Sequence, residues 1–305
     1  KNKNIILDHF STSQIQPSSI DLTLSEECYE IKASFLSSNT SVRENLKKLI
    51  NKKINLNKKY VFKKNHTYLV RLNEQLNLSK TIFGKCNPKS STGRLDIFCR
   101  TILDYSDEYE KIPLNYGGEI FLEVTSRSFN IEFKKGDSLN QMRLINKNHN
   151  YLNDNLLKKY HQKKPLVFNK SKNSFETKIS SGLKISVDLK NDNSINAYVS
   201  KKKSPTLIFR KVRSHKISNY WNCLYSKKGN LIIEPNRFYL LKSKQKIRIP
   251  KNMAGEMIPY DTGIGDFRVH YAGFFDPGFG NNFGSFAALE VKTNEVSFLL
   301  EDAQS

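Results

Sequence analysis

Leu122-Glu123-Val124 in the first half of the chain returns as Leu289-Glu290-Val291 in the second half. Other short matches follow in the same order, at offsets of roughly 170 residues. They pair Tyr68-Leu69 with Tyr239-Leu240, Gly84 with Gly255, Pro88 with Pro259, Gly118 with Gly284, and Ser19-Ile20-Asp21-Leu22 with Ser186-Val187-Asp188-Leu189. A single short match arises easily by chance, but a fixed order at nearly constant spacing indicates an internal repeat.

Both halves carry the pattern of β-strands. Short apolar runs at 68–72, 120–124, 238–241 and 287–291 are bounded by turn-forming residues. Helices are predicted only at Ser41–Asn51, where Ser41 suits the N-cap, and at Tyr151–Tyr160. The sequence therefore predicts an all-β protein with few short helices.

The repeat also predicts the domain boundaries. The polar, basic and aperiodic stretch in the middle of the chain is typical of a linker. We place the first domain at residues 1–147, the linker at 148–179 and the second domain at 180–305. Thr206–Asn230, which contains Trp221, has no obvious partner in the first half and is interpreted as an insertion.

Composition excludes several classes of protein. The chain has 305 residues, of which 38% are hydrophobic, so two folded cores are expected. No apolar run is long enough to span a bilayer. The four cysteines form no Cys-x-x-Cys pair, which argues against a zinc ribbon or disulfide scaffold and fits a reducing cytoplasm.

The formal net charge of +21 has two interpretations. A basic surface is typical of nucleic-acid binding, but Lys and Asn are abundant throughout this chain and no nucleic-acid motif accompanies them. Solvated lysines are the favoured interpretation, and nucleic acid is an unlikely partner.

Pro88-Lys89-Ser90-Ser91-Thr92-Gly93-Arg94 is the first motif that could carry chemistry. Two hydroxyls, a lysine, an arginine and a glycine turn suit a phosphate cradle. The spacing is not that of a Walker A loop. Without further context the segment could equally be a polar hairpin turn.

A second motif runs from Val269 to Phe279. Its Asp276-Pro277-Gly278 is a turn signature, and the apolar residues before it could form the wall of a flat pocket. A third motif, Lys134–Gln141, reads as a turn into a strand on which Gln141 presents an amide. Each of these could alone be a plain β-turn.

Glu290 and its counterpart Glu123 stand among apolar strand residues. Such a carboxylate either faces solvent by strand alternation or faces a dry pocket. In a dry pocket its pKa rises, which suits a general acid or base.

Together these motifs resemble the dCTP deaminase/dUTPase superfamily, most closely its two-domain bacterial deaminase branch. The matching segments are Gln16–Leu22, Pro88–Arg94, Lys135–Gln141, and Ile258–Asp261 followed by Phe267–Gly280. The resemblance implies two tandem distorted β-barrels of the dUTPase-like (β-clip) type. It also implies trimers with nucleotide sites between barrels, so that three chains would supply six barrels.

The resemblance further implies roles for individual residues. Ser90, Ser91 and Arg94 would grip phosphates and help to place the catalytic water, and Glu290 would activate that water. The dUTPases generally lack this glutamate, so its presence favours deamination. The residues expected to bind the substrate are Lys89, Gly93, Gln141, His270, Ala272, Gly273, Asp276, Gly278 and Phe279.

Neither half keeps every motif. The first half has Ser90 and Ser91 but carries the longer Ile102–Tyr116 in place of the Asp-Pro-Gly turn, and the second half has Asp261-Thr262-Gly263 where the serines should stand. We therefore hypothesise a composite site. The first domain would supply Pro88–Arg94, called the phosphate motif below, and the second would supply Glu290 and the turn at Asp276–Gly278, expected to bind the base. Glu123 is the runner-up base.

The expected reaction is hydrolytic deamination of dCTP to dUTP and ammonia. The H-x-E and P-C-x-x-C signature of zinc deaminases is absent, so no zinc is expected, and Mg²⁺ would arrive with the triphosphate. Alternatives are a dUTP diphosphatase, with Asp276 orienting the water, or a bifunctional enzyme. A non-catalytic nucleotide- or nucleic-acid-binding β-protein is an alternative of another class.

Overall fold

The computed structural model describes residues 5–6, 11–168, 177–190, 194–226, 228–258, 268–269, 273–281, 283–293 and 296–304. Its contacts divide the chain into two units, residues 1–149 with 202–220 and residues 150–201 with 221–305. Strands make up most of the regular structure, as the sequence predicts. No helix in these ranges is long and apolar enough to cross a membrane.

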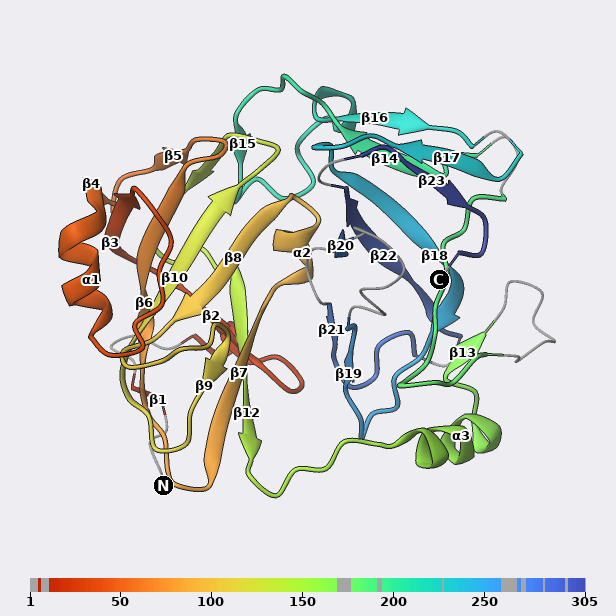
Figure 1. Cartoon of the computed structure of the whole chain (residues 1–305), viewed down its shortest axis with the longest axis horizontal. Coiled ribbons are helices and arrows are strands. Elements are labelled where there is room, and N and C mark those ends of the chain that lie inside the picture. Colours follow the sequence, from red (N-terminus) through yellow and green to blue (C-terminus); the bar gives the residue numbers. More distant parts are fainter. Residues whose placement is uncertain are drawn as a thin grey trace. The chain divides into compact units, whose positions relative to one another are not determined.

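The main sheet of the first unit has the strand order β4-β3-β6-β10-β8, with β1 pairing beside β6 (Figure 1). These strands are β1 (Ile5–Ile6), β3 (Leu24–Ile31), β4 (Ile50–Asn55), β6 (Thr67–Asn77), β8 (Ile97–Ile102) and β10 (Gly117–Ser126). Helix α1 (Val42–Leu49) lies against this sheet.

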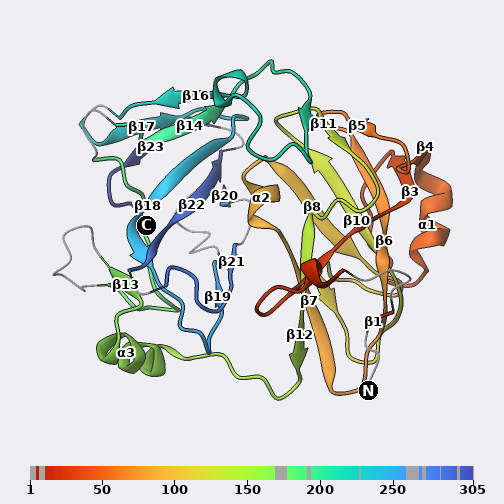
Figure 2. The same cartoon turned by 180° about the vertical axis from the view of Figure 1, so that it is seen from behind.

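The main sheet of the second unit repeats that order as β16-β14-β18-β22-β20, with β13 pairing beside β18 (Figure 2). These strands are β13 (Val167–Phe168), β14 (Ala197–Ser200), β16 (Trp221–Leu224), β18 (Tyr239–Ile247), β20 (Arg268–Val269) and β22 (Ser285–Lys292). Glu123 pairs with Leu69 in the first sheet, as Glu290 pairs with Leu240 in the second. The internal repeat is thus confirmed at the level of strand register.

The smaller sheets continue the correspondence. In the first unit β5 (Tyr60–Phe62) pairs with β11 (Ile131–Phe133), and in the second β17 (Asn230–Ile233) pairs with β23 (Phe298–Glu301). Even a side-chain contact is repeated, because the hydroxyls of Tyr68 and Tyr239 accept hydrogen bonds from the main chain of Lys63 and Glu234, at 3.0 and 2.9 Å.

The remaining sheets correspond only in part, since Gly84 of the first unit pairs with Ile112 as Gly255 of the second pairs with Phe275. The first has a sheet of order β2-β12-β7-β9, built from β2 (Ile20–Leu22), β7 (Ile82–Pro88), β9 (Lys111–Ile112) and β12 (Asn140–Asn146). The second has a ribbon of β19 (Gly255–Glu256) and β21 (Phe274–Phe275). The remaining elements are α2 (Ser90–Gly93), α3 (Asp154–Lys163), β15 (Leu207–Ile208) and two single 3₁₀ turns, Thr12–Gln14 and Ile217–Asn219.

Each main sheet buries apolar side chains. In the second unit Val199, Tyr239 and Val291 belong to one buried cluster. In the first unit Leu69 and Phe121 pack with Val42 and Leu46 of α1. The predicted helix at Ser41–Asn51 forms as α1, because the Ser41 hydroxyl accepts from the Glu44 main chain and the Glu44 carboxylate accepts from that of Ser41.

The segment 148–179, predicted as a linker, contains α3 and β13, and its described residues from Asn150 onward belong by their contacts to the second unit. Val167 of β13 pairs with Ile247 as Ile5 of β1 pairs with Leu76. β13 is therefore the second-half counterpart of β1, too short at two residues to show a strand period in the sequence.

One alignment made from the sequence is wrong. The main-chain N–H of Thr23 donates to the Glu74 carboxylate, and that of Ser186 donates in the same way to Gln245. Ser186 thus corresponds to Thr23 and not to Ser19. The match of Ser19–Leu22, which includes β2, with Ser186–Leu189 therefore does not hold, because hydrogen bonding and not local similarity sets the register.

The stretch interpreted as an insertion also has a counterpart. In the first unit β3 and β4 are joined by residues 32–49, which include α1. In the second unit the equivalent strands β14 and β16 are joined by residues 201–220, and Trp221 begins β16. Residues 202–220 belong to the first unit, where β15 pairs with β11.

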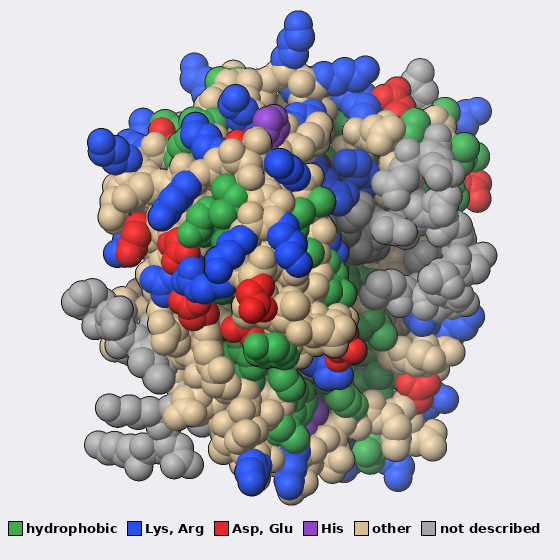
Figure 3. Space-filling view, turned by 60° about the vertical axis from the view of Figure 1, so that its left-hand side comes forward, with side chains coloured by type: hydrophobic (Ala, Val, Ile, Leu, Met, Phe, Trp, Pro, Cys, Tyr) green, Lys and Arg blue, Asp and Glu red, His purple; other side chains and the backbone are tan. Residues whose placement is uncertain are grey.

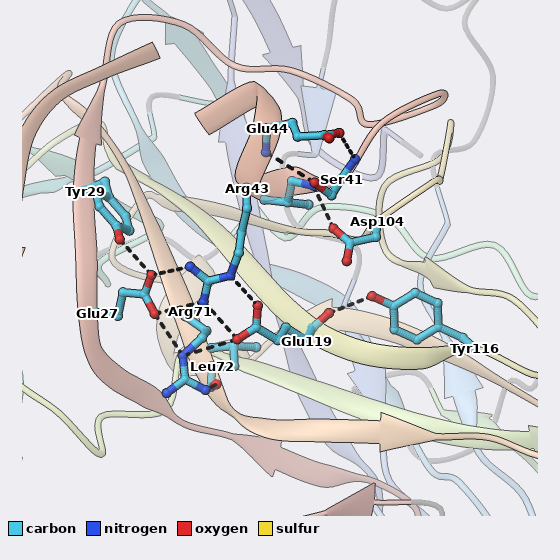
Figure 4. A network of polar contacts seen from close by, with 11 residues as sticks. Glu27, Tyr29, Ser41, Arg43, Glu44, Arg71, Leu72, Asp104, Tyr116 and Glu119 are labelled. Carbon is cyan, nitrogen blue, oxygen red and sulfur yellow. Dashed lines mark hydrogen bonds and ion pairs between the residues drawn. The ribbon is translucent and has the colours of Figure 1, made fainter. Parts of the chain in front are cut away.

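An ion-pair network fastens α1 to the first sheet (Figure 4). Arg43 of α1 contacts Glu27 of β3 at 2.9 Å and Glu119 of β10 at 2.7 Å. Arg71 of β6 contacts Glu27 from the other side at 3.1 Å. The Asp104 carboxylate accepts from the main chain of Val42 at the start of the helix. α1 is therefore held over the sheet by the ion pairs of Arg43 as well as by the apolar packing of Val42 and Leu46.

Charge on the first unit is mixed. On the face in Figure 3, Lys and Arg side chains are interspersed with Asp and Glu. This distribution fits solvated lysines better than a patch of one sign.

Candidate active site

The phosphate motif forms a short exposed turn at the end of β7. The main-chain N–H of Lys89 and the hydroxyl of Thr92 both donate to the Leu139 carbonyl, at 3.0 and 2.8 Å. This anchorage buries Thr92 and Gly93 and leaves Ser90, Ser91 and Arg94 exposed. The Arg94 guanidinium donates to the Ser90 carbonyl at 3.0 Å. Two hydroxyls and a guanidinium therefore share one surface, as phosphate binding requires.

A row of polar side chains runs beside this turn. Gln141 of β12 pairs with Asp21 of β2 on one side and with Asn87 of β7 on the other. All three are at least nine-tenths buried. The Ser19 hydroxyl donates to the Gln141 amide oxygen at 3.0 Å, which orients the amide. Asp21 forms an ion pair with Lys89. The structure thus brings Lys89 and Gln141 together with Ser90, Ser91 and Arg94.

Glu290 lies on β22 and is only 5% exposed. Its strand neighbours Leu289 and Val291 pack in the apolar core, so by alternation Glu290 faces the opposite side of the sheet. Leu240, directly across from it, and Tyr198, across from Leu240, are half-buried. The glutamate therefore does not face outward as an ordinary solvated strand residue would.

Glu123 occupies the same register in the first unit but is held by protein groups. Its carboxylate accepts from Arg100 of β8 at 2.9 Å and also from the Ser34 hydroxyl. Arg100 donates to the same hydroxyl at 2.7 Å and stacks over the Tyr109 ring at 3.7 Å. Glu123 is 2% exposed and its charge is neutralised by Arg100, so it is poorly suited to activate a water.

What covers the two glutamate faces also differs. In the first unit α1 packs over Leu69 and Phe121, on the face to which Glu123 belongs. In the second unit the equivalent connection, residues 202–220, is grouped with the first unit, and Ala288, on the Glu290 face, is exposed. The residue that corresponds to Arg100 in the repeat is His270, which lies outside the described residues, as does Ala272.

The predicted Asp-Pro-Gly turn is present. The Asp276 carbonyl accepts from the main-chain N–H of Phe279 at 3.0 Å, and Gly278 has φ of +85°. Proline followed by a positive-φ glycine is typical of a type II turn. The Gly278 and Phe279 main chains bond to Ile249, which fixes the turn beside β21. Gly273, at the start of this segment, accepts from the Met257 N–H at 2.8 Å.

Gly280 follows this turn at a position that has no room for a side chain. Its φ is +77°, and a Cβ there would lie 2.3 Å from the Ile247 carbonyl oxygen and 2.9 Å from the Ser285 nitrogen. We expect Gly280→Ala to destabilise the second unit by about 4 kcal/mol or more. Gly278→Ala is the matched control, because its nearest contact is 3.9 Å away, and it should cost only about 1–2 kcal/mol. Denaturation midpoints measure both, and equal losses would contradict the steric argument.

Glu110 is a functional candidate that the sequence reasoning missed. Its carboxylate accepts from the Thr101 main chain at 2.8 Å and from the Asn140 amide at 3.4 Å. Burial raises the pKa of the Glu110 carboxyl to about 7. Asn140 adjoins Leu139, the residue that anchors the phosphate motif. The one feature of the sequence that could have pointed to Glu110 is its place within Ile102–Tyr116, the segment that stands where the family carries the Asp-Pro-Gly turn.

The Glu110 pKa predicts a pH-dependent stability. The folded carboxyl titrates near pH 7 and the unfolded one near 4.5, so between these values the folded state binds more protons. The unfolding free energy should therefore fall as pH rises from 5 to 8, by about 2 kcal/mol after allowing for solvent screening. In Glu110→Gln this part of the pH dependence should vanish. An unchanged profile, measured by urea denaturation, would show that Glu110 does not titrate in this range.

No group of three or more His, Cys, Asp or Glu side chains suited to a metal ion occurs among the residues that the structure describes. A groove of about 430 Å³ in the second unit is lined mainly by β17, Arg237, Tyr239 and Leu299. None of the predicted site residues lines it, so we assign the chemistry to the motifs above and not to this groove.

Comparison with known proteins supplies a context for these motifs. Residues 1–148 match the family model of the 2′-deoxycytidine 5′-triphosphate deaminase N-terminal domain, and residues 153–305 match that of its C-terminal domain. A crystal structure of 2′-deoxycytidine 5′-triphosphate deaminase from Agrobacterium tumefaciens is similar, with a TM-score of 0.92 and 36% sequence identity. The match covers 99% of this chain and 90% of that one. A search of curated proteins found no match.

Proposed function

The chain belongs to the 2′-deoxycytidine 5′-triphosphate deaminase family and is a hydrolytic enzyme that converts dCTP and water into dUTP and ammonia; from this premise we propose how its residues do so. One site would combine the phosphate motif of the first half with the turn and Glu290 of the second. The observation that carries this assignment is that Glu123 is held by Arg100 on a face covered by α1, whereas Ala288, on the Glu290 face, is exposed.

In the proposed mechanism Glu290 removes a proton from a water held by the hydroxyl of Ser90 or Ser91 and by a main-chain carbonyl near Ala272. The hydroxide adds to C4 of cytosine. Glu290 gives this proton to N3, then takes the proton of the new C4 hydroxyl and passes it to the 4-amino group; the C4–N bond breaks, ammonia leaves and the C4 carbonyl of uracil forms. Because no protein-bound zinc is proposed, accurate placement of the water must supply more of the barrier reduction.

The phosphate contacts are proposed for Lys89, Gly93 and Arg94, with Mg²⁺ entering as part of the Mg·dCTP substrate. Gln141 and the turn residues Gly273, Asp276, Gly278 and Phe279, with His270 and Ala272, would hold the base and sugar. Main-chain groups on a rigid turn suit this task, because they present fixed donors and acceptors at no entropic cost. We further propose a homotrimer of cytoplasmic location, in which three chains supply six barrels.

The test of this function is release of ammonia from Mg·dCTP by the purified chain, with and without a zinc chelator. We expect ammonia and dUTP in equal amounts and no effect of chelation. Release of pyrophosphate with dUTP as substrate would instead support the bifunctional alternative. Absence of ammonia from dCTP would contradict the proposal.

A further inference from the structure

Asp21 is a buried carboxylate that forms an ion pair with Lys89 of the phosphate motif. It is 7% exposed. One carboxylate oxygen accepts from the Lys89 ammonium and, at 3.4 Å, from the Gln16 amide. The other oxygen is buried and has no hydrogen-bond partner among the described residues. Lys89 is the only cation within ion-pair distance of Asp21 in those residues.

The pair exists only in the half that keeps the serines. Asp21 lies on β2, and once Ser186 is aligned with Thr23 the basic residue Lys184 takes the position of Asp21 in the second half. In the repeat Tyr260 takes the position of Lys89. The ion pair therefore accompanies the phosphate motif and is not a general feature of the fold.

We propose that Asp21 is a positioning residue, which holds the Lys89 ammonium in place for the phosphates of the substrate. This inference rests on the proposed function, in which Lys89 binds phosphate. An ammonium has three N–H donors, so a single contact with Asp21 leaves donors for a ligand. A free lysine side chain loses rotamer entropy when a ligand fixes it. Because the ion pair with Asp21 already orders the Lys89 side chain, substrate binding has a smaller entropic cost.

A carboxylate near a triphosphate also repels it, so the two effects must be weighed. Asp21 is largely neutralised by its own ion pair, which limits the repulsion. Lys89 cannot leave Asp21 at low cost, because an unpaired buried charge costs several kcal/mol. The orienting effect therefore outweighs the repulsion, and loss of Asp21 should weaken substrate binding and not strengthen it.

The experiment is steady-state deamination of Mg·dCTP by Asp21→Asn. We expect KM to rise roughly three- to tenfold, with kcat within about a factor of two. The inhibition constant of inorganic triphosphate, as competitor, should rise by the same factor. The matched control is Glu26→Gln, which removes the exposed pair between Glu26 and Lys135 in the same unit and should change neither constant. A KM for Asp21→Asn that is unchanged or lower would overturn the inference.

Three further variants separate the possible failures. Lys89→Met should raise KM, and adding Asp21→Asn to it should have no further effect. If Lys89→Met raises KM but Asp21→Asn does not, only the positioning role is wrong. If Lys89→Met itself leaves KM unchanged, the phosphate role of Lys89 is wrong as well. Should Asp21→Asn fail to fold, Asp21→Glu keeps the charge and displaces it by one methylene; a raised KM supports positioning and an unchanged KM contradicts it.

Discussion

Glu290→Gln is expected to slow the release of ammonia from dCTP by roughly 10²- to 10⁴-fold, the usual contribution of a general acid–base group. Glutamine has nearly the same shape as glutamate but cannot accept the proton of the attacking water. The side chain is 5% exposed and faces the side of the sheet opposite to the apolar core, so the substitution should leave the strand pairing of β22 intact. The readout is the initial rate of ammonia release at saturating Mg·dCTP, together with the denaturation midpoint.

Glu123→Gln is the matched control, because it makes the same chemical change at the same register of the repeat. Its carboxylate already forms hydrogen bonds with Arg100 and Ser34, so we expect kcat and KM to stay near those of the natural chain. If Glu123→Gln is inactive while Glu290→Gln is active, the enzyme is still a deaminase but the assignment of its base is wrong.

Arg100→Met is expected to destabilise the first unit by about 3–5 kcal/mol, since it leaves the buried carboxylate of Glu123 without its cation. Methionine keeps much of the apolar stem, so the loss reports mainly on the charge. Further substitution of Glu123→Gln in the same chain should recover most of the stability, because a neutral amide needs no counter-ion. Denaturant midpoints of the single and double variants give the coupling between the two residues.

Lys59→Met serves as the comparison for Arg100→Met. Lys59 pairs with Glu132 at 3.6 Å but is 65% exposed, and exposed pairs contribute about 0–1 kcal/mol. A loss for Arg100→Met no larger than that for Lys59→Met would mean that Glu123 is not held as a buried ion pair. Glu123 would then have no structural role through Arg100.

Local signals in the sequence predicted several elements well. The Ser41 cap and the Leu46 side of the following helix were sufficient to place α1, because a capping box acts over one turn. Leu122-Glu123-Val124 and Leu289-Glu290-Val291 identified two equivalent strands, because a match in strand residues preserves register. Asp276-Pro277-Gly278 identified a turn, because proline and glycine restrict the main chain directly.

Other features could not be predicted from the sequence. The match of Ser19 with Ser186 failed because a few similar residues do not report on hydrogen-bond register. β13 was missed because two residues have no period. The pairs of Asp21 with Lys89 and of Arg100 with Glu123 join residues from different structural elements, and no spacing rule connects them.

The sequence by itself therefore determined that this chain contains two related all-β halves, with the segment Pro88–Arg94 in the first and an equivalent strand glutamate in each. Only the tertiary structure showed that Glu123 pairs with Arg100 beneath α1. The physical reason is that strand alternation fixes the face on which a side chain lies, whereas its charge state and access to water depend on what packs over that face. In the first unit Arg100 pairs with Glu123 and α1 packs over the same face. Arg100 and α1 lie far apart in the sequence, so no local pattern connects them.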